Sequence, residues 1–184
     1  MKFVLASHNK GKLSEMQEIL GELGVEVVLQ SELGLDLEPE ETGETFLDNA
    51  RIKARAVMEA GGLPAIADDS GLCVDALNGA PGVYSARYGG LEDDAARCRL
   101  LLQNMRGSMT RAAHFHTSVV CVFPDGTELT AQGECPGTIA YAPLGGGGFG
   151  YDPVFLYPPL RKTFAQMTAE EKNAVSHRGN ALRA

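Results

Sequence analysis

Residues 2–29 read KFVLASHNKGKLSEMQEILGELGVEVVL. The short apolar run Lys2–Ala6 predicts a buried strand, and the apolar positions after it recur at helical spacing. These positions are Leu13, Met16, Ile19, Leu20 and Leu23. Gly24 favours the end of that helix, and Val25–Leu29 predicts a second strand. A chain that opens with strand, loop, helix and strand indicates an α/β fold.

The remainder of the chain continues to alternate between strands and helices. Helical spacing predicts helices at 45–60, at 93–105 and at 168–183, the last one broken near His177. Apolar or alternating runs predict strands at 65–67, 72–76, 115–123, 128–132 and 154–156. The turn Pro124-Asp125-Gly126 joins two of these as a hairpin, which is expected to belong to a second lobe. We therefore expect residues 1–184 to form one domain of two lobes with a cleft between them.

Length and composition exclude several classes of protein. Hydrophobic residues make up 44% of the 184 residues, and no apolar run reaches the roughly 18 residues of a membrane span. The apolar start is too short for a signal peptide, so a cytoplasmic protein is expected. A net charge of −8 argues against long-range attraction to nucleic acid or to an anionic membrane. The four cysteines have neither a CxxC pair nor zinc-ligand spacing, which favours reduced, buried thiols.

The loop after the first strand carries groups suited to phosphate oxygens. Ser7, Asn9 and Lys12 supply a hydroxyl, a carboxamide and an ammonium group at the start of a helix, whose backbone N–H groups attract anions. The spacing differs from the GxxxxGK[ST] pattern of a P-loop. Serine and asparagine also cap helices, and Lys12 could simply be solvated, so the loop alone also fits a structural role.

A polar stripe runs along the helix that begins near residue 45. Thr45, Asn49 and Lys53 are four residues apart and share one side of it. Lys53 interrupts a face that otherwise looks buried, so its ammonium group either points into a cleft or reaches solvent. Glu40 and Glu41 precede the helix in an acidic loop, where carboxylates also stabilise a helix N-terminus by charge alone.

The sequence Asp68-Asp69-Ser70-Gly71 follows a strand of small apolar residues. Open α/β sheets bind ligands at the carboxyl ends of their strands, where we expect the two carboxylates to lie. Adjacent like charges repel each other, so a nearby cation would stabilise them, and hard oxygen ligands beside a triphosphate indicate Mg²⁺. One of the two acids could instead deprotonate water. An Asp-rich turn without a ligand is the alternative.

Two further segments carry groups that could contact a nucleotide. Gly145–Asp152 contains Phe149 and Tyr151 for stacking on a planar base, although a mobile hairpin with a core aromatic also explains the segment. His177 and Arg178 supply donors for carbonyl or phosphate oxygens, or they form a charge motif at the end of a helix. Four other arginines are expected to be solvated or ion-paired, namely Arg51, Arg55, Arg87 and Arg97.

These motifs occur in a distinctive order. The series is Ser7-x-Asn9-x-Gly11-Lys12, Glu40-Glu41-Thr42-Gly43, Thr45-Phe46-x-x-Asn49-Ala50-x-x-Lys53-Ala54, Ala67-Asp68-Asp69-Ser70-Gly71-Leu72, Gly79–Tyr88, Gly147–Pro153 and Ser176-His177-Arg178-Gly179. Over nearly the whole chain, from Val4 to about Leu182, the sequence resembles the inosine triphosphate pyrophosphatase family, whose members remove non-standard purine nucleotides.

The resemblance implies a fold and a reaction. The fold would be α/β, with two lobes around a long mixed β-sheet, flanking helices and a central nucleotide-binding cleft. The reaction would be the Mg²⁺-dependent hydrolysis of ITP, dITP or XTP to the nucleoside monophosphate and pyrophosphate, which cleanses the nucleotide pool. Members of the family are typically homodimers, so a homodimer is expected. The partner would be a purine nucleoside triphosphate, with no nucleic acid and no membrane.

The resemblance also implies roles for individual residues. Phosphate contacts are assigned to Ser7, His8, Asn9, Lys10, Gly11, Lys12 and Lys53. Within the loop, His8 and Lys10 have no separate role. Asp69 would be the catalytic proton acceptor and a metal ligand, with Glu41 and Asp68 completing the metal surroundings. Nucleotide contacts are assigned to Ser70, Phe149, Gly150, Tyr151, Asp152, Lys172, His177 and Arg178.

Hydrogen bonding suggests how the base would be selected. Hypoxanthine and xanthine carry a 6-oxo acceptor where adenine carries a 6-amino donor. Donors from His177, Arg178 or backbone amides would pair with the former and stay unpaired against the latter. Guanine shares the 6-oxo group, and the sequence does not show how it is rejected.

Three rival functions remain at this stage. A non-catalytic nucleotide sensor would lack the acidic cluster that Glu41, Asp68 and Asp69 provide. A phosphatase of another kind would act on a nucleoside monophosphate or a sugar phosphate and would not release pyrophosphate. A purely structural α/β domain leaves the clustered polar motifs unexplained.

Overall fold

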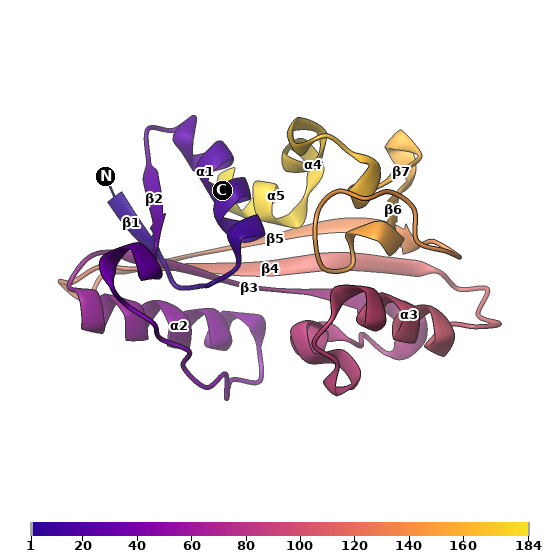
Figure 1. The fold of residues 1–184 in the computed structure, drawn as a ribbon, viewed down its shortest axis with the longest axis horizontal. Helices are drawn as coiled ribbons and strands as arrows, with labels where there is room; N and C mark the ends of the chain where they lie inside the picture. The colour runs from indigo at the N-terminus through magenta and orange to yellow at the C-terminus, as the bar shows by residue number, and fades with distance from the viewer. Residues whose placement is uncertain (1, 184) are drawn as a thin grey trace. The chain divides into compact units, whose positions relative to one another are not determined.

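The computed structural model describes residues 2–183 and contains a seven-stranded mixed β-sheet flanked by helices (Figure 1). The strands lie in the order β2-β1-β3-β4-β5-β6-β7. They are β1 (Lys2–Leu5), β2 (Glu26–Leu29), β3 (Ala65–Val74), β4 (Ala112–Val122), β5 (Glu128–Ile139), β6 (Phe155–Tyr157) and β7 (Lys162–Thr163). β1 pairs in parallel with β2 and β3, whereas β6 pairs antiparallel with β5 and β7. The predicted α/β class with a mixed sheet is confirmed.

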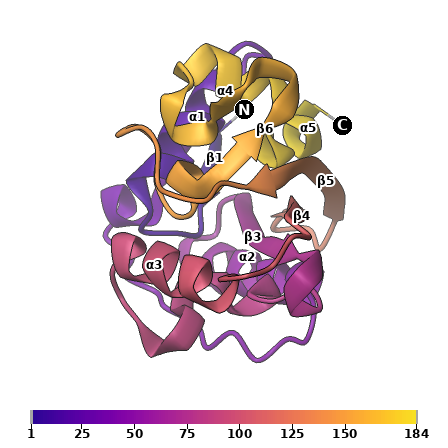
Figure 2. The same ribbon diagram turned by 90° about the vertical axis from the view of Figure 1, so that its right-hand side faces the viewer.

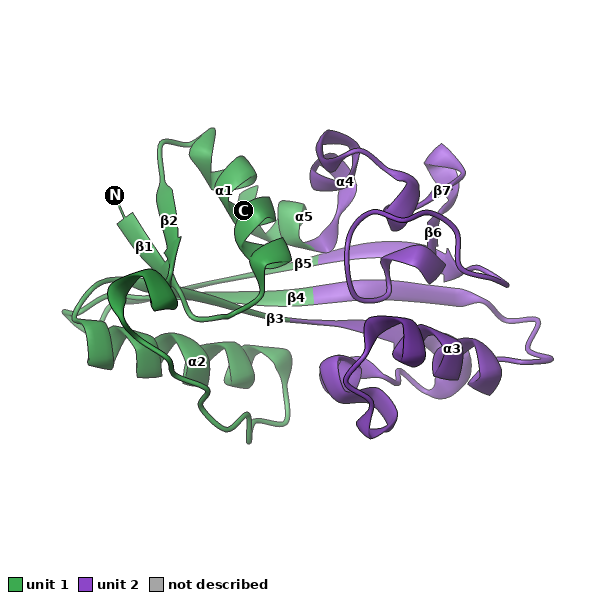
Figure 3. Ribbon diagram, viewed as in Figure 1, with its two compact units in different colours: residues 1–69, 117–133, 178–184 green, residues 70–116, 134–177 purple. Residues whose placement is uncertain are grey.

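The chain forms two compact units (Figure 3). Among the described residues, unit 1 comprises 2–69, 117–133 and 178–183, and unit 2 comprises 70–116 and 134–177. Three strands, β3, β4 and β5, pass from one unit into the other. One domain of two lobes with a cleft between them stays a prediction. The hairpin turn Pro124-Asp125-Gly126, which was expected to belong to a second lobe, lies in unit 1 with residues 117–133.

Unit 1 is built in three layers. Helix α1 (Lys10–Gly21) and helix α5 (His177–Arg183) lie on one face of its strands, and helix α2 (Phe46–Gly61) lies on the opposite face (Figure 1). Successive side chains of β1 alternate between the two faces, because the side-chain period of a strand is two residues. Phe3 and Leu5 therefore pack in the cluster with α1, and Val4 packs in the cluster with α2.

The ends of α1 and α2 follow from capping residues. Asn9 is the N-cap of α1 and accepts the N–H of Lys12 at 3.1 Å. Thr45 is the N-cap of α2 and accepts the N–H of Asp48 at 3.1 Å. Gly62 ends α2 with a φ of 68°, a left-handed conformation that favours glycine.

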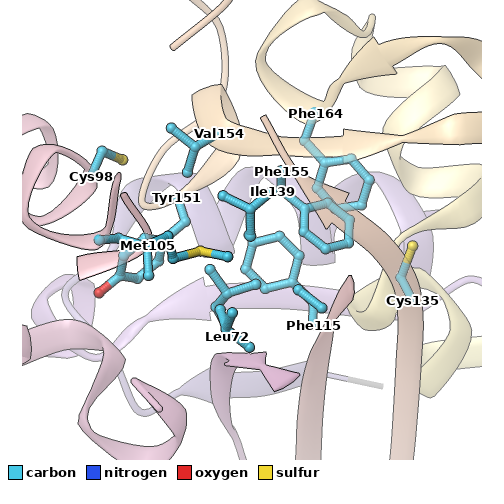
Figure 4. Close-up of a cluster of buried hydrophobic side chains, with 13 residues drawn as sticks. Leu72, Cys98, Met105, Phe115, Cys135, Ile139, Tyr151, Val154, Phe155 and Phe164 are labelled. Carbon is cyan, nitrogen blue, oxygen red and sulfur yellow. The ribbon is translucent and has the colours of Figure 1, made fainter. Parts of the chain in front are cut away.

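Unit 2 has helix α3 (Asp94–Asn104) on one side of its strands and helix α4 (Ala169–Val175) on the other (Figure 2). Its core contains a group of aromatic rings (Figure 4). The ring centroid of Phe115 lies 4.4 Å from that of Phe155 and 5.5 Å from that of Phe164. Short 3-10 turns lie at Gln30–Leu33, Asp75–Leu77, Gly82–Gly90, Asp152–Val154, Pro158–Leu160 and Phe164–Gln166.

Two predictions of local structure are wrong and one is confirmed. The strands expected at 65–67 and 72–76 are one continuous strand, so Asp68 and Asp69 lie within β3 and not at a carboxyl end. The strand tolerates both acids because each carboxylate has a cationic partner. Leu23 is 64% exposed, because α1 already ends at Gly21. The break in the last helix is confirmed, since the extended Ser176 separates α4 from α5.

All four cysteines are free, as expected. Cys98 and Cys135 are buried, whereas Cys73 and Cys121 are half-buried. Burial raises the pKa of the Cys121 and Cys135 thiols to about 11, so both are protonated at neutral pH. No helix within residues 2–183 is long and apolar enough to cross a membrane.

Candidate functional site

The predicted site residues divide between the two units. Unit 1 contains Ser7–Lys12, Glu41, Lys53, Asp68, Asp69 and Arg178. Unit 2 contains Ser70, Phe149–Asp152, Lys172 and His177. The groups proposed for phosphate and metal therefore lie in unit 1 together with Arg178, and those proposed for the base lie mostly in unit 2.

Asp68 and Asp69 point to opposite faces of β3, because successive side chains alternate along a strand. Asp68 faces the side of α1 and α5, where it meets Lys12 and Arg178. Asp69 faces the side of α2, where it meets Lys53. The cations expected near the two carboxylates are therefore lysine and arginine side chains, and each carboxylate has different ones.

The ammonium group of Lys53 lies among three oxygen atoms in unit 1. Lys53 Nζ is 3.6 Å from Asp69 Oδ1 and 3.3 Å from Glu41 Oε1, and it donates to the carbonyl oxygen of Asp68 at 2.8 Å. Its side chain is largely buried. The sequence left two directions open for this lysine, and the structure turns it inward, away from solvent.

Asn49 connects Asp69 to the acidic loop. Its fully buried side chain donates to Asp69 Oδ2 at 3.3 Å and accepts the N–H of Gly43 at 2.8 Å. A Cβ on Gly43 would lie 2.6 Å from Asp48 Cβ, so glycine permits this close approach. The predicted polar stripe is confirmed, because both Asn49 and Lys53 reach Asp69.

The surroundings of Asp69 make it a better proton acceptor than an ordinary aspartate. Burial raises the pKa of Asp69, the Lys53 ammonium opposes that shift, and the Glu41 carboxylate adds to it. Burial also lowers the pKa of the Lys12 ammonium, although the neighbouring Asp68 carboxylate opposes the change. A carboxylate with a raised pKa is suited to general base chemistry.

A second ionic group surrounds Asp68, whose side chain is fully buried. Arg178 Nε and Nη2 donate to Asp68 Oδ2 at 3.2 and 3.0 Å, and Arg178 Nη1 donates to Glu15 on α1. Lys12 Nζ lies 3.2 Å from Asp68 Oδ1. Burial would lower the pKa of Arg178, but Asp68 and Glu15 outweigh it and raise the pKa. Two cations and two carboxylates thus compensate one another inside unit 1.

The metal group of Glu41, Asp68 and Asp69 stays a prediction. Residues 2–183 contain no cluster of three or more His, Cys, Asp or Glu side chains placed to hold an ion. The Asp68 carboxylate is engaged by Lys12 and Arg178, and only its carbonyl oxygen faces Lys53. The remaining donors, two carboxylates and one carbonyl, are hard oxygen ligands of the kind that Mg²⁺ prefers. Glu41 and Asp69 therefore fit the ion chemically.

The loop from Ser7 to Lys12 is folded onto the start of α1. Ser7 Oγ accepts the N–H of Asn9 at 3.0 Å, and Asn9 Oδ1 accepts the N–H of Lys12. His8 lies 3.4 Å from the Asp36 carboxylate. Asn9 thus caps the helix and Ser7 binds the backbone of that cap residue, and the phosphate contacts of both stay a prediction.

In unit 2, an ion pair organises the group proposed for the base. Lys172 Nζ lies 2.6 Å from Asp152 Oδ2, and both side chains are buried. The same Asp152 oxygen accepts the N–H of Phe149 at 3.0 Å, and Lys172 Nζ lies 4.5 Å from the centroid of the Phe149 ring. A Cβ on Gly148 would lie 2.1 Å from Asp152 Oδ2, so this position requires glycine.

Two other predicted nucleotide contacts have structural partners in unit 2. Tyr151 belongs to the buried core, and its hydroxyl donates to the carbonyl oxygen of Ser85 at 2.6 Å. The ring of His177 stacks on Phe115 with 4.6 Å between centroids. Phe149 and Ser70 are only half-buried. Of the two aromatic residues proposed to stack on a base, Phe149 is the less buried.

Two residues that contact these groups were missed in the sequence. Glu15 receives the Nη1 donor of Arg178, and its spacing of three residues from Lys12 on one helix was a usable signal. Asp94 accepts the N–H of Gly150 at 3.0 Å. Asp94 and Gly150 are 56 positions apart in the sequence, so no local pattern indicated their contact.

A hollow of about 600 Å³ lies elsewhere in unit 2. It is lined by Arg99, Leu102, Gln103, Met105, Arg106, Gly107, Arg111 and Tyr141. None of the predicted site residues contributes to it. The chemistry described above therefore places the candidate site in the two polar groups and not in this hollow.

The chain is similar to known proteins over nearly its whole length. The Ham1 family model matches residues 3–184. The chain is 50% identical to a dITP/XTP pyrophosphatase of Yersinia pestis, with 99% of this chain and 94% of that protein aligned. It is 48% identical to a dITP/XTP pyrophosphatase of Streptomyces coelicolor, with 100% and 94% aligned. A HAM1 protein from Coxiella burnetii superposes with a TM-score of 0.88 at 44% identity, over 100% of this chain and 95% of that chain.

Proposed function

The chain belongs to the Ham1 family, and we propose that it hydrolyses the non-standard purine nucleoside triphosphates ITP, dITP and XTP to the nucleoside monophosphate and pyrophosphate. The observation that carries the proposal is the environment of Asp69. This carboxylate is buried, has a raised pKa, receives a hydrogen bond from Asn49 and lies beside Lys53 and Glu41.

Asp69 acts as the general base in the proposed reaction. Asn49 donates to one oxygen of the carboxylate, which leaves the other oxygen to accept a proton from water. The oxygen of that water forms a bond to the α-phosphorus. The bond from the α-phosphorus to its bridging oxygen breaks, and pyrophosphate leaves with the electron pair. The proton resides on Asp69 and then returns to solvent.

Lys12 and Lys53 bind the phosphates in this proposal. Each ammonium group already lies within 4 Å of an internal carboxylate, Asp68 for Lys12 and Glu41 for Lys53. Phosphate oxygens would take over these carboxylate contacts, so little additional desolvation of the lysines is required. Fixed cations beside the leaving pyrophosphate stabilise the charge that develops on it. The N-terminus of α1 adds a favourable positive potential.

We propose Mg²⁺ as the cofactor. Glu41 and Asp69 would hold the ion through carboxylate oxygens, in the region that Lys53 now shares with them. When bound, Mg²⁺ supplies further neutralisation of the triphosphate charge. The oxygen-only donor set around Lys53 supports this choice over zinc, which takes nitrogen or sulfur ligands more often.

The residues of unit 2, together with Arg178, would recognise the nucleotide. Phe149 offers a half-exposed ring face for the base, and Lys172, His177 and Arg178 are candidate donors to the 6-oxo group of hypoxanthine or xanthine. Adenine would place an amino donor against these donors and leave them unpaired. Further contacts are proposed for Ser70, Gly150, Tyr151 and Asp152.

The setting of the enzyme is also a proposal. We infer a homodimer in the cytoplasm that acts on free nucleotides and cleanses the nucleotide pool. The names of the relatives, dITP/XTP pyrophosphatase, support a free nucleotide as substrate. Light scattering of the purified protein tests the dimer, and a mass near 19.6 kDa would contradict it.

Product analysis with ITP, dITP, XTP, GTP and ATP, with and without Mg²⁺, tests the proposed reaction. Metal-dependent release of pyrophosphate, fastest from the first three, is the expected result. Release of orthophosphate would show that a different bond is cleaved. Tight binding of ITP without turnover would favour the nucleotide sensor that the sequence left open.

A further inference from the structure

Two side chains of helix α3 form hydrogen bonds with Gly150 in the segment Phe149–Asp152. The N–H of Gly150 donates to Asp94 Oδ2 at 3.0 Å, and the carbonyl oxygen of Gly150 accepts from Cys98 Sγ at 3.4 Å. Burial raises the pKa of the Cys98 thiol to about 11, so it is protonated and can donate at neutral pH. Both main-chain polar groups of Gly150 are thus bound by the first two turns of one helix.

Asp94 is itself held in place. Its other oxygen, Oδ1, accepts from Arg97 Nη2, and Arg97 Nη1 donates to the carbonyl oxygen of Leu91 at 2.8 Å. Arg97 is buried, which restricts its motion. Asp94 also lies in the first turn of α3, where the helix dipole stabilises a negative charge. One carboxylate oxygen of Asp94 therefore accepts from Arg97, and the other accepts from Gly150.

The segment follows a run of glycines, a residue type with many accessible backbone conformations. Four consecutive glycines, 145–148, provide no side chains to fix its direction, and Gly148 and Gly150 have positive φ values of 68° and 62°. Asp152 accepts the N–H of Phe149, and Tyr151 donates to Ser85. The Asp94 contact fixes the peptide that lies between these two anchors.

Asp94 is not required to begin α3. The N-cap is Asp93, whose side chain accepts the N–H of Ala96 at 2.9 Å. Two adjacent aspartates at one helix start thus have different partners. Asp93 binds the helix itself, whereas Asp94 binds a loop 56 residues away.

We propose that Asp94 is a positioning residue for nucleotide recognition, which sets the affinity for the base by accepting the N–H of Gly150. The inference rests on the proposed function, in which Phe149 and Asp152 contact the nucleotide. Asp94 acts through the loop and leaves the groups of unit 1 that bind phosphate unchanged. Its removal should therefore weaken the binding of a nucleotide more than the binding of a bare polyphosphate.

Steady-state kinetics of Asp94→Ala, Asp94→Asn and the control Asp93→Ala test this separation. ITP is the substrate, and inorganic tripolyphosphate, which has no base, is the competitive inhibitor. In Asp94→Ala we expect KM for ITP to rise about tenfold, the effect of losing one hydrogen bond to a charged group. The kcat and the inhibition constant of tripolyphosphate should stay within twofold. Asp93→Ala should lower the melting temperature and leave KM unchanged.

The conservative variant and hydrogen exchange complete the test. Asp94→Asn retains a weaker oxygen acceptor, so KM should rise about threefold. Amide exchange of the peptide containing Gly150 should be fastest in Asp94→Ala, intermediate in Asp94→Asn and slow in wild type and Asp93→Ala. An unchanged KM, or a parallel loss of tripolyphosphate and ITP affinity, would overturn the proposal. If Asp94→Ala does not fold, unchanged KM and exchange in Asp94→Asn would overturn it.

Turnover of ITP by the wild-type protein distinguishes an error in the proposed function from an error in the role of Asp94. If the proposed function is wrong, wild type itself releases no pyrophosphate from ITP. In that case the exchange data still decide whether Asp94 holds Gly150. If only the inference is wrong, wild type turns over ITP and the Asp94 variants match it.

Discussion

Replacing Lys53 by methionine removes one ammonium group from unit 1 and preserves most of the side-chain volume. Lys53 Nζ lies 2.8 Å from the carbonyl oxygen of Asp68, 3.3 Å from Glu41 Oε1 and 3.6 Å from Asp69 Oδ1. At an effective dielectric constant of about 20, unit charges separated by that last distance attract by about 4–5 kcal/mol. Water that reaches the 10% exposed Asp69 side chain reduces this value, so it is an upper limit for the Lys53–Asp69 pair.

The proposed role of Lys53 gives the expected effect on catalysis. A hydrogen bond to a charged group contributes about 1.5–3 kcal/mol. Loss of one phosphate contact of this kind raises KM for ITP about 10- to 150-fold. The kcat should fall as well, because one of the fixed cations beside the leaving pyrophosphate is gone. Lys53→Arg retains the charge and should recover part of the loss.

Pyrophosphate release at varied ITP concentration measures both parameters. Arg55→Met is the matched control, because Arg55 is also a cation on α2 but pairs with Glu128 at 2.9 Å and is largely exposed. Its KM should stay within twofold of wild type. A folded Lys53→Met variant with a KM within twofold of wild type would refute the assignment of Lys53 to the phosphates.

Three further predictions concern other groups. Asp69→Asn removes the proton acceptor but keeps the shape of the side chain, so kcat should fall at least about 100-fold with nucleotide affinity retained; turnover near the wild-type rate would exclude Asp69 as the base. Arg178→Met leaves a buried carboxylate with one cation fewer, so urea denaturation should show a loss of about 3–5 kcal/mol in unfolding free energy, and a loss below about 1 kcal/mol would contradict the buried pair. The thiols of Cys98, Cys121 and Cys135, each with a pKa of about 11, should react slowly with a chromogenic disulfide reagent at pH 8 and faster as the pH rises, because the thiolate is the reactive form. Because Cys73 is the fourth thiol, rapid reaction of two or more thiols per native chain at pH 8 would contradict the raised pKa values.

Helices, turns and helix breaks that depend on residues close in sequence were predictable from the sequence. The helix at 45–60 was expected from its apolar spacing, and α2 occupies Phe46–Gly61 between Thr45 and Gly62. The hairpin turn at Pro124–Gly126 and the break near His177 are likewise present. These features follow from spacing, capping and turn preference, which act over a few residues. The order of the motifs was also sufficient to predict the family.

The partners of the charged groups were decided by the tertiary structure. Arg178 binds Glu15 across 163 residues of sequence, and the spacing of Glu15 from Lys12 does not indicate Arg178 as the partner. Asp68 and Asp69 were expected at the carboxyl end of a strand, yet they lie within the continuous strand β3, which directs them to opposite faces and to different cations. The energy of an ion pair depends on distance and burial. Both quantities are set when helices pack on a sheet, and periodicity along the chain does not encode them.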